Sequence, residues 1–380
     1  MTRVRVGLDY RPALVNREGI GRYTRELVRA LVELGADDNL ALFGSTLSPA
    51  RFSAEELGLS NSKARSLRLR VPSKWLPFLM GASGRGADDW LGGVDVFHHT
   101  QPNLLTVREA AQVATIFDCI FINPEGGLDR GGWLDVAGAR RMEQAARAQV
   151  ERSRLLLVPT VYVAGEVARL LGAAPEKIVV TELGCDHATR RALPRTRPAS
   201  ASEAFVLTVS RVDGRKNHVR MLAAFEKLVA AGLPQRWIVA GPRGHGADAF
   251  DAALERSSAR GRIVRLEHVS EAELARLYAA ADAFLFASLS EGFGLPPLEA
   301  MLHAVPTVVA KATCLPEVCG DGALYVDPLD VDSIAAGLAR VLEDKDLAGE
   351  LSERGLARAK KFTWSACAQK TLAAYAAAGC

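Results

Sequence analysis

No apolar run in this 380-residue sequence reaches the ~18–20 residues that a membrane-spanning helix needs. An excess of charge of one sign is also missing. The 47 Lys and Arg residues face 44 Asp and Glu, and a formal net charge of +3 argues against an obligate nucleic-acid binder. We expect no signal peptide, because the chain opens Met1-Thr2-Arg3 and enters a strand-like pattern at once. These absences predict a soluble protein, or one that lies on a membrane surface without crossing it.

Cysteine is scarce and irregularly spaced. The six cysteines form no Cys-x-x-Cys pair and no Cys/His cluster with the spacing of zinc ligands. Most of them lie in apolar stretches, which favours reduced thiols in a cytoplasmic protein. The cysteines are Cys119, Cys185, Cys314, Cys319, Cys367 and Cys380. No pair of aspartates suited to a divalent metal is evident, so we predict neither a metal site nor a bound cofactor.

The sequence does contain an alternation of short apolar segments and Ala-rich helical segments, within an ordinary globular composition of 49% hydrophobic and 24% charged residues. Strands separated by helices are typical of a mostly parallel sheet covered on both faces, so the predicted fold class is α/β. The expected strands are Val4–Leu8, Leu40–Phe43, Val94–Phe97, Val113–Phe117, Leu155–Val158, Ile178–Thr181, Phe205–Val209, Trp237–Ala240, Ile263–Leu266, Ala283–Phe286 and Thr307–Val309.

The alternation breaks at residues 187–203, which carry two prolines, four arginines and no apolar period. This break predicts a linker between two α/β domains, 1–187 and 188–363, each of ordinary domain size. The closing helix, within 364–380, either caps the second domain or crosses back onto the first. Ligands of open α/β sheets bind beyond the carboxyl ends of the strands, so two such sheets facing one another would enclose a cleft between the domains.

The most informative segment runs from Ser290 to Met301, after an expected strand and into an expected helix. Gly292 and Gly294 precede the helix N-terminus, where backbone N–H groups and the helix dipole favour an anion. Glu291 and Glu299 bracket this turn. A carboxylate there can accept two vicinal ribose hydroxyls while backbone donors hold a phosphate. The plainer alternative is a Gly/Pro loop with one surface glutamate and one glutamate near the start of a helix.

A second segment, Ser210–His218, follows another expected strand and carries Arg211, Arg215 and Lys216. Arg offers a fork of donors and Lys a point charge, a combination suited to a diphosphate. Only one acid, Asp213, lies among them, so most of this positive charge has no counter-charge within the segment. A solvated basic loop is the alternative.

The third segment, Asn16–Thr24, lies between the first strand and the first helix and contains Gly19 and Gly21. Glycines at this place allow close backbone approach at a helix N-terminus. The dinucleotide fingerprint Gly-x-Gly-x-x-Gly is not completed, because Thr24 occupies its third glycine position. This argues against a nicotinamide or flavin enzyme.

Together, the three segments resemble the retaining glycosyltransferases with two facing Rossmann-like domains (the GT-B fold), specifically family 4, also called group 1. Three shorter stretches match the same family in order and spacing, so the resemblance covers nearly the whole chain. They are Gly184-Cys185-Asp186, Leu315–Val318 with Gly320–Ala323, and Phe362-Thr363-Trp364.

The resemblance implies a role for each site residue. Glu299 would hold the ribose hydroxyls of a nucleotide-sugar, and Glu291 would contact the donor sugar near its C3 hydroxyl. Arg215 and Lys216 would hold the diphosphate. The base would lie between the stretches around two further residues, Gly241 and Val269. The other donor-side residues that the resemblance implies are Gly19, Gly21, Arg211, Phe293, Gly294 and Leu295.

By the same resemblance, the protein transfers a hexose from a nucleotide-diphosphate sugar to a glycan or lipid-linked saccharide, in polysaccharide or glycolipid synthesis, with retention at the anomeric carbon. Catalysis would be chiefly stabilisation of the leaving nucleoside diphosphate by preorganised cations and N–H groups. Arg and Lys can fill the charge role of a metal, so metal-independent transfer is implied. The resemblance favours GDP-mannose as donor and leaves UDP-hexoses open.

One position departs from the family. A His-Asp pair commonly follows the central strand of the first domain, and here Phe117 stands in the histidine's place before Asp118. Asp118 is a candidate for acceptor orientation or proton handling. One interpretation is that His98 or His99, at the end of the preceding strand, supplies an imidazole instead. The alternative is that both are strand-end histidines without a catalytic role.

This departure makes a nucleotide-sugar-binding protein without transfer activity the alternative function. Among enzymes, the runner-up is a phosphorylase or a nucleotide-sugar epimerase built on the same scaffold. A phosphorylase would need a lysine site for pyridoxal phosphate, and the sequence reveals no such site.

The stretch from Asn61 to Ala87 has six basic residues and no acidic one, with aromatic and apolar residues among them. The basic residues are Lys63, Arg65, Arg68, Arg70, Lys74 and Arg85, and the others are Trp75, Leu76, Phe78, Leu79 and Met80. Such a stretch fits peripheral contact with the inner face of a membrane, as a lipid-linked acceptor would need. The alternative is a strand with a solvated face followed by a loop.

Overall fold

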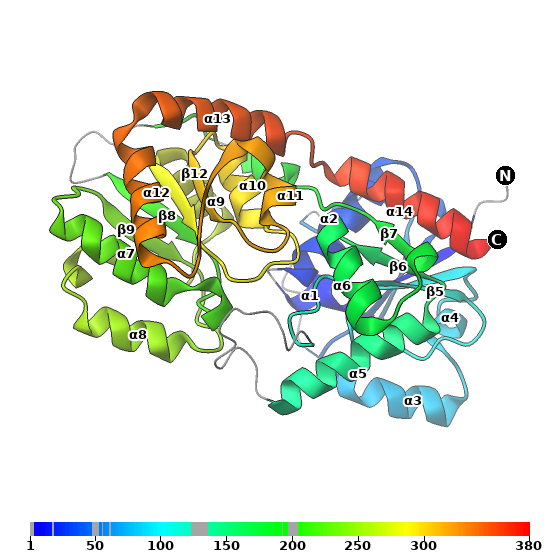
Figure 1. The fold of residues 1–380 in the computed structure, drawn as a ribbon. Coiled ribbons are helices and arrows are strands. Elements are labelled where there is room, and N and C mark those ends of the chain that lie inside the picture. Colours follow the sequence, from blue (N-terminus) through cyan, green and yellow to red (C-terminus); the bar gives the residue numbers. More distant parts are fainter. Residues whose placement is uncertain are drawn as a thin grey trace. The chain divides into compact units, whose positions relative to one another are not determined.

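The computed structural model describes residues 4–16, 19–47, 53–54, 56–60, 62–122, 136–191, 193–196 and 204–380. They form two compact α/β units, each built on its own sheet (Figure 1). The first unit comprises Met1–Ile122, Ala137–Gly184 and Thr363–Cys380, and the second contains Cys185–Phe362. The chain therefore passes between the units at Gly184–Cys185, slightly before the predicted boundary, and again at Phe362–Thr363.

The first unit has a seven-stranded sheet in which neighbouring strands are parallel. The strands are β1 (Val6–Asp9), β2 (Leu40–Ser45), β3 (Arg65–Leu69), β4 (Val96–His99), β5 (Ala111–Thr115), β6 (Leu155–Val158) and β7 (Ile178–Val180), in the order β3-β2-β1-β4-β5-β6-β7. The central strands β1, β2 and β4 are buried along their whole length, as parallel strands between helical layers are. Edge strand β3 alternates polar with leucine residues and is partly exposed.

Helix α6 (Val161–Leu171) of the first unit begins and ends at recognisable signals. For α6, the Thr160 hydroxyl accepts a hydrogen bond from the Val163 N–H at the start, and Gly172 in the left-handed region ends the helix. The helices are α1 (Arg11–Val15), α2 (Ile20–Glu33), α3 (Leu76–Ser83), α4 (Ala87–Trp90), α5 (Val136–Arg152), α6 (Val161–Leu171) and α14 (Trp364–Gly379), with 3-10 turns η1 (Asp37–Asn39), η2 (Ser73–Trp75) and η3 (Pro175–Lys177).

The closing helix α14 returns to the first unit, where it packs on α2, β4, β5 and β6. Thr363 caps its N-terminus by accepting a hydrogen bond from the Ala366 N–H. Near its other end, the buried Tyr375 hydroxyl lies 2.7 Å from Nδ1 of His98 on β4. Of the two positions that the sequence left open for this helix, the structure shows the return to the first domain.

The second unit has a six-stranded parallel sheet around a core that includes Trp237, Phe225 and Phe250. Its strands are β8 (Phe205–Val209), β9 (Arg236–Ala240), β10 (Ile263–Leu266), β11 (Ala283–Phe286), β12 (Thr307–Ala310) and β13 (Ala323–Val326), in the order β10-β9-β8-β11-β12-β13. Its helices are α7 (His218–Ala230), α8 (Ala247–Arg256), α9 (Glu271–Ala280), α10 (Leu295–Leu302), α11 (Leu315–Cys319), α12 (Val331–Glu343) and α13 (Lys345–Ala359), with 3-10 turns η4 (Asp186–Arg191), η5 (Gly214–Lys216), η6 (Arg260–Arg262) and η7 (Gly320–Gly322).

The predicted linker is in part an ordered piece of the second unit. Its first residues lie in the 3-10 turn η4, in which the Thr189 hydroxyl donates to the Asp186 carbonyl at 2.7 Å. Further on, the Arg195 guanidinium donates to the Ala281 carbonyl at 2.7 Å, and the Thr196 N–H to that of Ala279 at 2.9 Å. Residues 192 and 197–203 of the predicted linker lie outside the described residues.

Both sheets show the strand order of doubly wound nucleotide-binding folds. The winding reverses between β1 and β4 in the first unit and between β8 and β11 in the second. Ligands of such folds bind beyond the carboxyl ends of the strands at this point. Within the ranges described above, no helix combines the length and apolarity needed to cross a membrane. All six cysteines are free, five of them buried and Cys380 exposed.

Candidate functional site

The candidate site lies at the carboxyl edge of the second sheet, where β8 and β11 are parallel neighbours. The two segments singled out in the sequence, Ser210–His218 and Ser290–Met301, follow these two strands. Their chain positions are far apart, but the strand pairing brings both loops to the winding reversal of the sheet.

The loop after β8 folds into the turn η5 and ends at Asn217. Asn217 has a φ of 65°, in the left-handed region that asparagine tolerates better than most residues. Its side-chain amide donates to the carbonyls of Ala287 at 2.9 Å and Pro328 at 2.7 Å. Asn217 therefore ties the Arg-Lys turn to the loop that follows β11.

The loop after β11 enters α10 through Gly294, which has a φ of 91° that favours glycine. The backbone of Glu291 is fixed on both sides: its N–H donates to the Thr313 hydroxyl, and its carbonyl accepts from the Cys314 thiol, both at 3.2 Å. The N–H groups of the first turn of a helix have no partner within that helix. Pro296 and Pro297 of that turn have no N–H, so the backbone donors at this edge are those of residues 293–295, at and just before the start of the helix.

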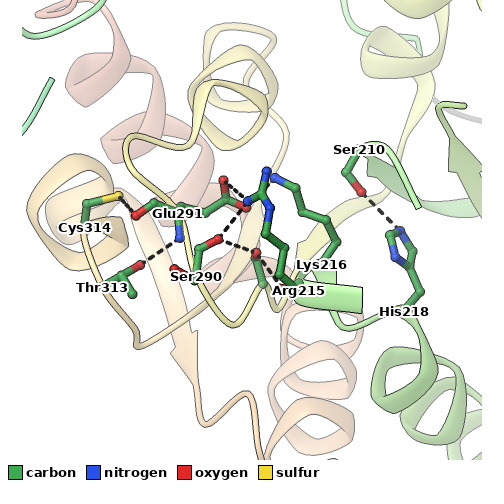
Figure 2. A network of polar contacts seen from close by, with 9 residues as sticks. Ser210, Arg215, Lys216, His218, Ser290, Glu291, Thr313 and Cys314 are labelled. Atoms are coloured by element: carbon green, nitrogen blue, oxygen red, sulfur yellow. Dashed lines mark hydrogen bonds and ion pairs between the residues drawn. The ribbon is translucent and has the colours of Figure 1, made fainter. Parts of the chain in front are cut away.

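Glu291 bridges the two cations of the preceding loop (Figure 2). Lys216 Nζ lies 2.5 Å from Oε1, and Arg215 Nη1 lies 3.2 Å from Oε2. Arg215 also donates to the Ser290 carbonyl at 2.9 Å. Lys216 is 8% exposed and Glu291 7%, whereas the Arg215 side chain is 22% exposed. The structure thus brings together three of the predicted catalytic residues in one largely buried cluster.

Burial and the charges of the neighbouring groups shift the pKa values of Glu291 and Lys216. Burial acts to raise the pKa of Glu291, but the positive charges of Lys216 and Arg215 and the hydrogen bond from Lys216 outweigh it, so the pKa lies below its ordinary value. Burial and the neighbouring Arg215 lower the pKa of Lys216, although Glu291 opposes this effect. With all three groups ionised, the cluster carries one net positive charge. An entering phosphate would compensate that charge and favour the protonated form of Lys216.

Glu299 is held by hydrogen bonds from two other buried side chains of the second unit. His187 Nε2 lies 2.9 Å from Oε1, and the Tyr278 hydroxyl donates to Oε2 at 3.0 Å. Glu299 itself is only 3% exposed. These two hydrogen bonds fix the orientation of the Glu299 carboxylate.

The other predicted donor-side residues of the second unit follow β8, β9, β10 and β11 along the same sheet edge. Gly241 has a φ of 142°, and a Cβ there would lie 2.2 Å from the Ser210 carbonyl oxygen, so only glycine allows this close approach to the backbone just before Arg211. Val269 is half-buried and precedes Ser270, which caps α9. Phe293 is buried, with its ring centroid 5.7 Å from that of Phe362.

Comparison with known proteins identifies the family. The family described as "Glycosyl transferases group 1" matches residues 190–358, and the "Glycosyl transferase 4-like domain" matches residues 18–184. The chain is 33% identical over 372 residues to O-antigen chain mannosyltransferase B of Escherichia coli, covering 94% of this chain and 95% of that protein. It is a group 1 glycosyltransferase. The family resemblance seen in the sequence is confirmed.

A second relative matches this glycosyltransferase over a shorter segment. The MMP alpha-(1->4)-mannosyltransferase of Mycolicibacterium hassiacum is 42% identical over 111 residues, which is 28% of this chain and 27% of that protein.

Solved structures confirm the GT-B fold class. Sucrose-phosphate synthase from Thermosynechococcus elongatus matches 98% of both chains with a TM-score of 0.72 at 19% identity. Anabaena Alr3699/HepE, in complex with UDP and glucose, matches 98% of this chain and 99% of its own, with a TM-score of 0.72 at 16% identity. At these identities the likeness concerns the fold alone.

In the first unit, the glycine loop of this glycosyltransferase shows why both glycines are needed. Gly19 has a φ of 49° at the N-terminus of α2. A Cβ on Gly21 would lie 2.0 Å from the Asn16 carbonyl oxygen. Arg17 and Glu18 of the same segment lie outside the described residues.

Phe117, which the resemblance assigns to a histidine's position, packs its ring edge-on against Tyr23 of α2, with centroids 4.9 Å apart and an interplanar angle of 82°. The expected strand Val113–Phe117 placed this residue inside the sheet, but β5 ends at Thr115. The half-buried Asp118 therefore lies in the loop beyond the strand, at the carboxyl edge of the first sheet.

His98 and His99 are fully buried on β4. His98 is hydrogen-bonded through both ring nitrogens, to the Tyr375 and Thr115 hydroxyls at 2.7 Å each, and burial is the main cause that lowers its pKa to about 3. His99 Nε2 lies 3.0 Å from Gln112 Oε1, and burial lowers its pKa to about 4. Two buried, neutral imidazoles favour the alternative in which neither histidine is catalytic.

Asp9 and Arg11, which were not predicted as site residues, form a bidentate pair at the carboxyl end of β1. Arg11 Nε lies 2.8 Å from Asp9 Oδ1, and Nη2 lies 2.6 Å from Oδ2, with Asp9 fully buried. Gln101 also donates to Asp9 at 3.0 Å. The available signal was an acid that ends an apolar strand with an arginine two residues later. His187 and Tyr278 gave no such signal, because nothing local connects them with Glu299.

Proposed function

We propose that this glycosyltransferase transfers a hexose, with mannose the first candidate, from a nucleotide-diphosphate sugar to a glycan or lipid-linked saccharide in polysaccharide or glycolipid synthesis. The buried cluster of Arg215, Lys216 and Glu291 at the winding reversal of the second sheet carries the proposal. Two relatives are named as mannosyltransferases, which supports mannose and, with it, GDP-mannose as the donor.

In the proposed donor complex, the diphosphate takes over the cations that Glu291 holds in this structure. Arg215 offers two parallel N–H donors and Lys216 a point charge, and the backbone N–H groups of residues 293–295 add further donors. The Glu291 carboxylate is then available to accept a hydrogen bond from a hydroxyl of the donor sugar. Glu299, already oriented by His187 and Tyr278, accepts hydrogen bonds from the ribose hydroxyls.

The proposed chemistry is stabilisation of the leaving group. Negative charge grows on the nucleoside diphosphate as the bond to the sugar breaks, and Arg215, Lys216 and the backbone N–H groups are already in place to meet it. The acceptor hydroxyl attacks from the face of the leaving group, so the anomeric configuration is retained. Asp118, at the carboxyl edge of the first sheet, is the candidate that orients the acceptor.

We include metal independence in the proposal, because Arg215 and Lys216 supply the positive charge that a divalent ion would otherwise bring. In the part of the chain that the structure describes, no group of three or more His, Cys, Asp or Glu residues is arranged to hold a metal ion. Transfer that is unchanged by a chelator would support this part of the proposal, and transfer abolished by a chelator and restored by Mg²⁺ or Mn²⁺ would refute it.

We also propose a cytoplasmic location. Five buried free thiols are typical of proteins in a reducing compartment, where disulfides do not persist. A fusion of the chain to a reporter that is active only in the cytoplasm tests this directly, and an inactive reporter on a folded fusion would contradict it.

The donor site is tested by thermal unfolding with GDP, UDP, dTDP and ADP at millimolar concentration. A nucleotide present at about 100 times its dissociation constant adds about 2.7 kcal/mol of stability. We expect GDP to stabilise the wild type and Lys216→Gln to lose most of that effect, whereas the exposed control Lys345→Gln keeps it. Folded wild-type protein that none of the nucleotides stabilises would refute the donor site.

Turnover is tested with labelled GDP-mannose and a panel of mannoside acceptors. We expect a product whose anomeric configuration, determined by NMR, matches that of the donor, and Glu291→Ala should lose turnover. An inverted product would refute retention. Nucleotide binding with neither transfer nor donor hydrolysis would favour the alternative, a binding protein of the same fold.

A further inference from the structure

The turn η2 and helix α3 of the first unit expose two large aromatic side chains while burying their neighbours. Trp75 is 53% exposed and Phe78 67%. They are three positions apart and therefore lie on the same side of the helix. Leu76 and Met80 are almost completely buried, so this segment is anchored to its unit and the aromatics point outward (α3 lies at the lower edge of Figure 1).

The packing beneath α3 explains why the aromatics stay outside. Leu76 and Met80 belong to a core cluster with Phe43 of β2 and Phe97 of β4, which already fills the inner side of the helix. A rotation that buried Phe78 would expose Leu76 and Met80 instead. The outward position of the two aromatics is thus fixed by the fold.

A third apolar side chain extends this area. Leu47, two residues after β2, is 66% exposed. The Thr46 N–H donates to the Leu69 carbonyl at 3.1 Å, and the Ser45 hydroxyl to that of Val71 at 2.6 Å. These bonds place the end of β2 beside the chain that leads into η2. We call Leu47, Trp75 and Phe78 with the surrounding cations the α3 surface.

The cations of the α3 surface are Arg70, Lys74 and Arg85, all exposed, which follow β3, lie in η2 and follow α3 respectively. The sequence from 61 to 87 has no acidic residue. The next acids along the chain are engaged elsewhere: Asp88 accepts from the backbone N–H groups of residues 108–110, and Asp89 from that of Gly86. Within residues 61–87 the sequence thus places no carboxylate beside these three cations.

We propose that the α3 surface docks on an anionic lipid bilayer. Tryptophan and phenylalanine partition into the interfacial region of a bilayer, and nearby Lys and Arg attract acidic headgroups. Exposed aromatic side chains with cations before and after a short helix that is anchored by Leu76 and Met80 fit this geometry. The structure thus favours the membrane alternative for the basic stretch, with α3 in place of the expected loop after the solvated strand β3.

The proposal deepens the proposed function, because a protein held on the cytoplasmic leaflet can reach a lipid-linked acceptor, but lipid binding requires no donor. It is tested by co-sedimentation of the full chain with vesicles of phosphatidylglycerol and phosphatidylcholine. Vesicles of phosphatidylcholine alone are the comparison. We expect binding to the anionic vesicles, weakened by salt, and a blue shift of tryptophan emission that Trp75→Phe removes.

Matched variants locate the contact. Trp75→Ser with Phe78→Ser should weaken vesicle binding by roughly tenfold or more, whereas Val161→Ser, at a 65% exposed position on α6, should not change it. Arg70→Gln with Lys74→Gln should weaken binding about 25-fold, at about fivefold for each charge. Lys345→Gln on α13 is the charge control. All variants should keep the stabilisation by GDP, which separates this test from that of the donor site.

Three outcomes would overturn the proposal. The first is no binding to anionic vesicles by protein that GDP still stabilises. The second is binding that the aromatic and charge variants leave unchanged. The third is self-association in sedimentation velocity that Trp75→Ser with Phe78→Ser abolishes, since this would show that the surface contacts a second copy of the chain.

Discussion

The two glutamates of the candidate site are held by different kinds of partner. Glu291 is held by two cations, and Glu299 by a histidine ring and a phenol. A phosphate competes directly with a carboxylate for cations, so the contacts of Glu291 are exchangeable. We expect a phosphate not to compete for the hydrogen bonds from His187 and Tyr278, so Glu299 keeps its orientation when a nucleotide binds.

His187→Ala should therefore weaken nucleoside diphosphate binding by roughly tenfold or more, because a hydrogen bond to a charged group is lost. His187→Gln, which retains a side-chain N–H donor, should recover part of the affinity. Isothermal titration with GDP measures both. Inorganic pyrophosphate, which has no ribose, is the control ligand, and its affinity should not change. Equal losses for GDP and pyrophosphate would show that His187 only supports the fold.

Glu291→Gln should change the pH dependence of stability. The folded-state pKa of Glu291 is lowered, so its ionised form stabilises the protein above the ordinary glutamate pKa of about 4.3, and this stability is lost as the pH falls through the folded-state value. We expect Glu291→Gln to cost about 1–3 kcal/mol at pH 7, because it leaves Lys216 buried without a counter-charge. The difference from wild type should shrink below about pH 4.

Urea unfolding between pH 7 and pH 3.5 measures this difference. The double variant Lys216→Gln with Glu291→Gln should recover part of the loss, because it removes both buried charges together. A difference that stays constant over this pH range would contradict the assignment of the effect to the ionised carboxylate.

Among the elements, α14 is joined to the first unit by a chain of buried hydrogen bonds. Tyr375 on α14 contacts His98 on β4, His98 contacts Thr115 on β5, and the Thr115 hydroxyl lies 3.0 Å from that of Tyr23 on α2. The ring of Tyr23 in turn packs on Phe117. A buried polar network of this kind favours one packing arrangement only when each polar group has its hydrogen-bond partner.

Tyr375→Phe should accordingly destabilise the protein by about 1–3 kcal/mol, because it leaves His98 Nδ1 buried without its partner. Thermal and urea unfolding measure the loss. Tyr325→Phe in the second unit is the control, since the Tyr325 hydroxyl is part-buried and donates to the Gly320 carbonyl. Its removal should cost less, and a larger loss for Tyr325→Phe would contradict this view of the network.

The elements that the sequence predicted best are short apolar runs, whose burial ranges from complete in β11 to partial in β10. Strands such as β8, β11 and β6 are short apolar runs between helices, and their observed bounds equal the expected ones. The strand β13 (Ala323–Val326) was not predicted, because it directly follows a Gly-rich turn and is only four residues long. The bounds of β5 were shifted by two residues, since Ile116 and Phe117 continue the apolar run beyond the last strand residue.

The candidate site, like the strands, was predicted from the sequence only in part. Arg215, Lys216 and Glu291 lie in loops after predicted strands, so the topology of a doubly wound sheet brings them to one edge. Their mutual contact also depends on Asn217, whose two long-range hydrogen bonds have no signature in the sequence. The partners of Glu299 come from η4 and α9, and only the folded chain brings these elements to α10.

At the scale of the whole molecule, two of the points at which the chain passes between the units, Gly184–Cys185 and Phe362–Thr363, lie side by side. On the second unit, the Cys185 N–H donates to the Phe362 carbonyl at 3.0 Å. On the first unit, Gly184 lies against Trp364: a Cβ on Gly184 would be 2.2 Å from the Trp364 nitrogen. The close contact at this place requires glycine.

Gly184→Ala should therefore destabilise the protein by about 1–3 kcal/mol, because the added methyl group meets backbone atoms that cannot rotate away. Gly165→Ala is the matched control, since nothing lies within 4 Å of a Cβ there and the site is inside α6. That variant should be neutral or stabilise the protein by up to about 1 kcal/mol. Equal effects of the two substitutions in urea unfolding would contradict the argument.

The return of α14 to the first unit also sets the order in which the two units can be completed during synthesis. Residues 363–380 leave the ribosome after all of Cys185–Phe362, so the second unit has its full set of strands while β4 and β5 still lack the helix that covers them. Until α14 has been synthesised, the nascent first unit therefore lacks the helix that packs on Tyr23 and His98. A chain interrupted anywhere in the second unit leaves the first incomplete as well.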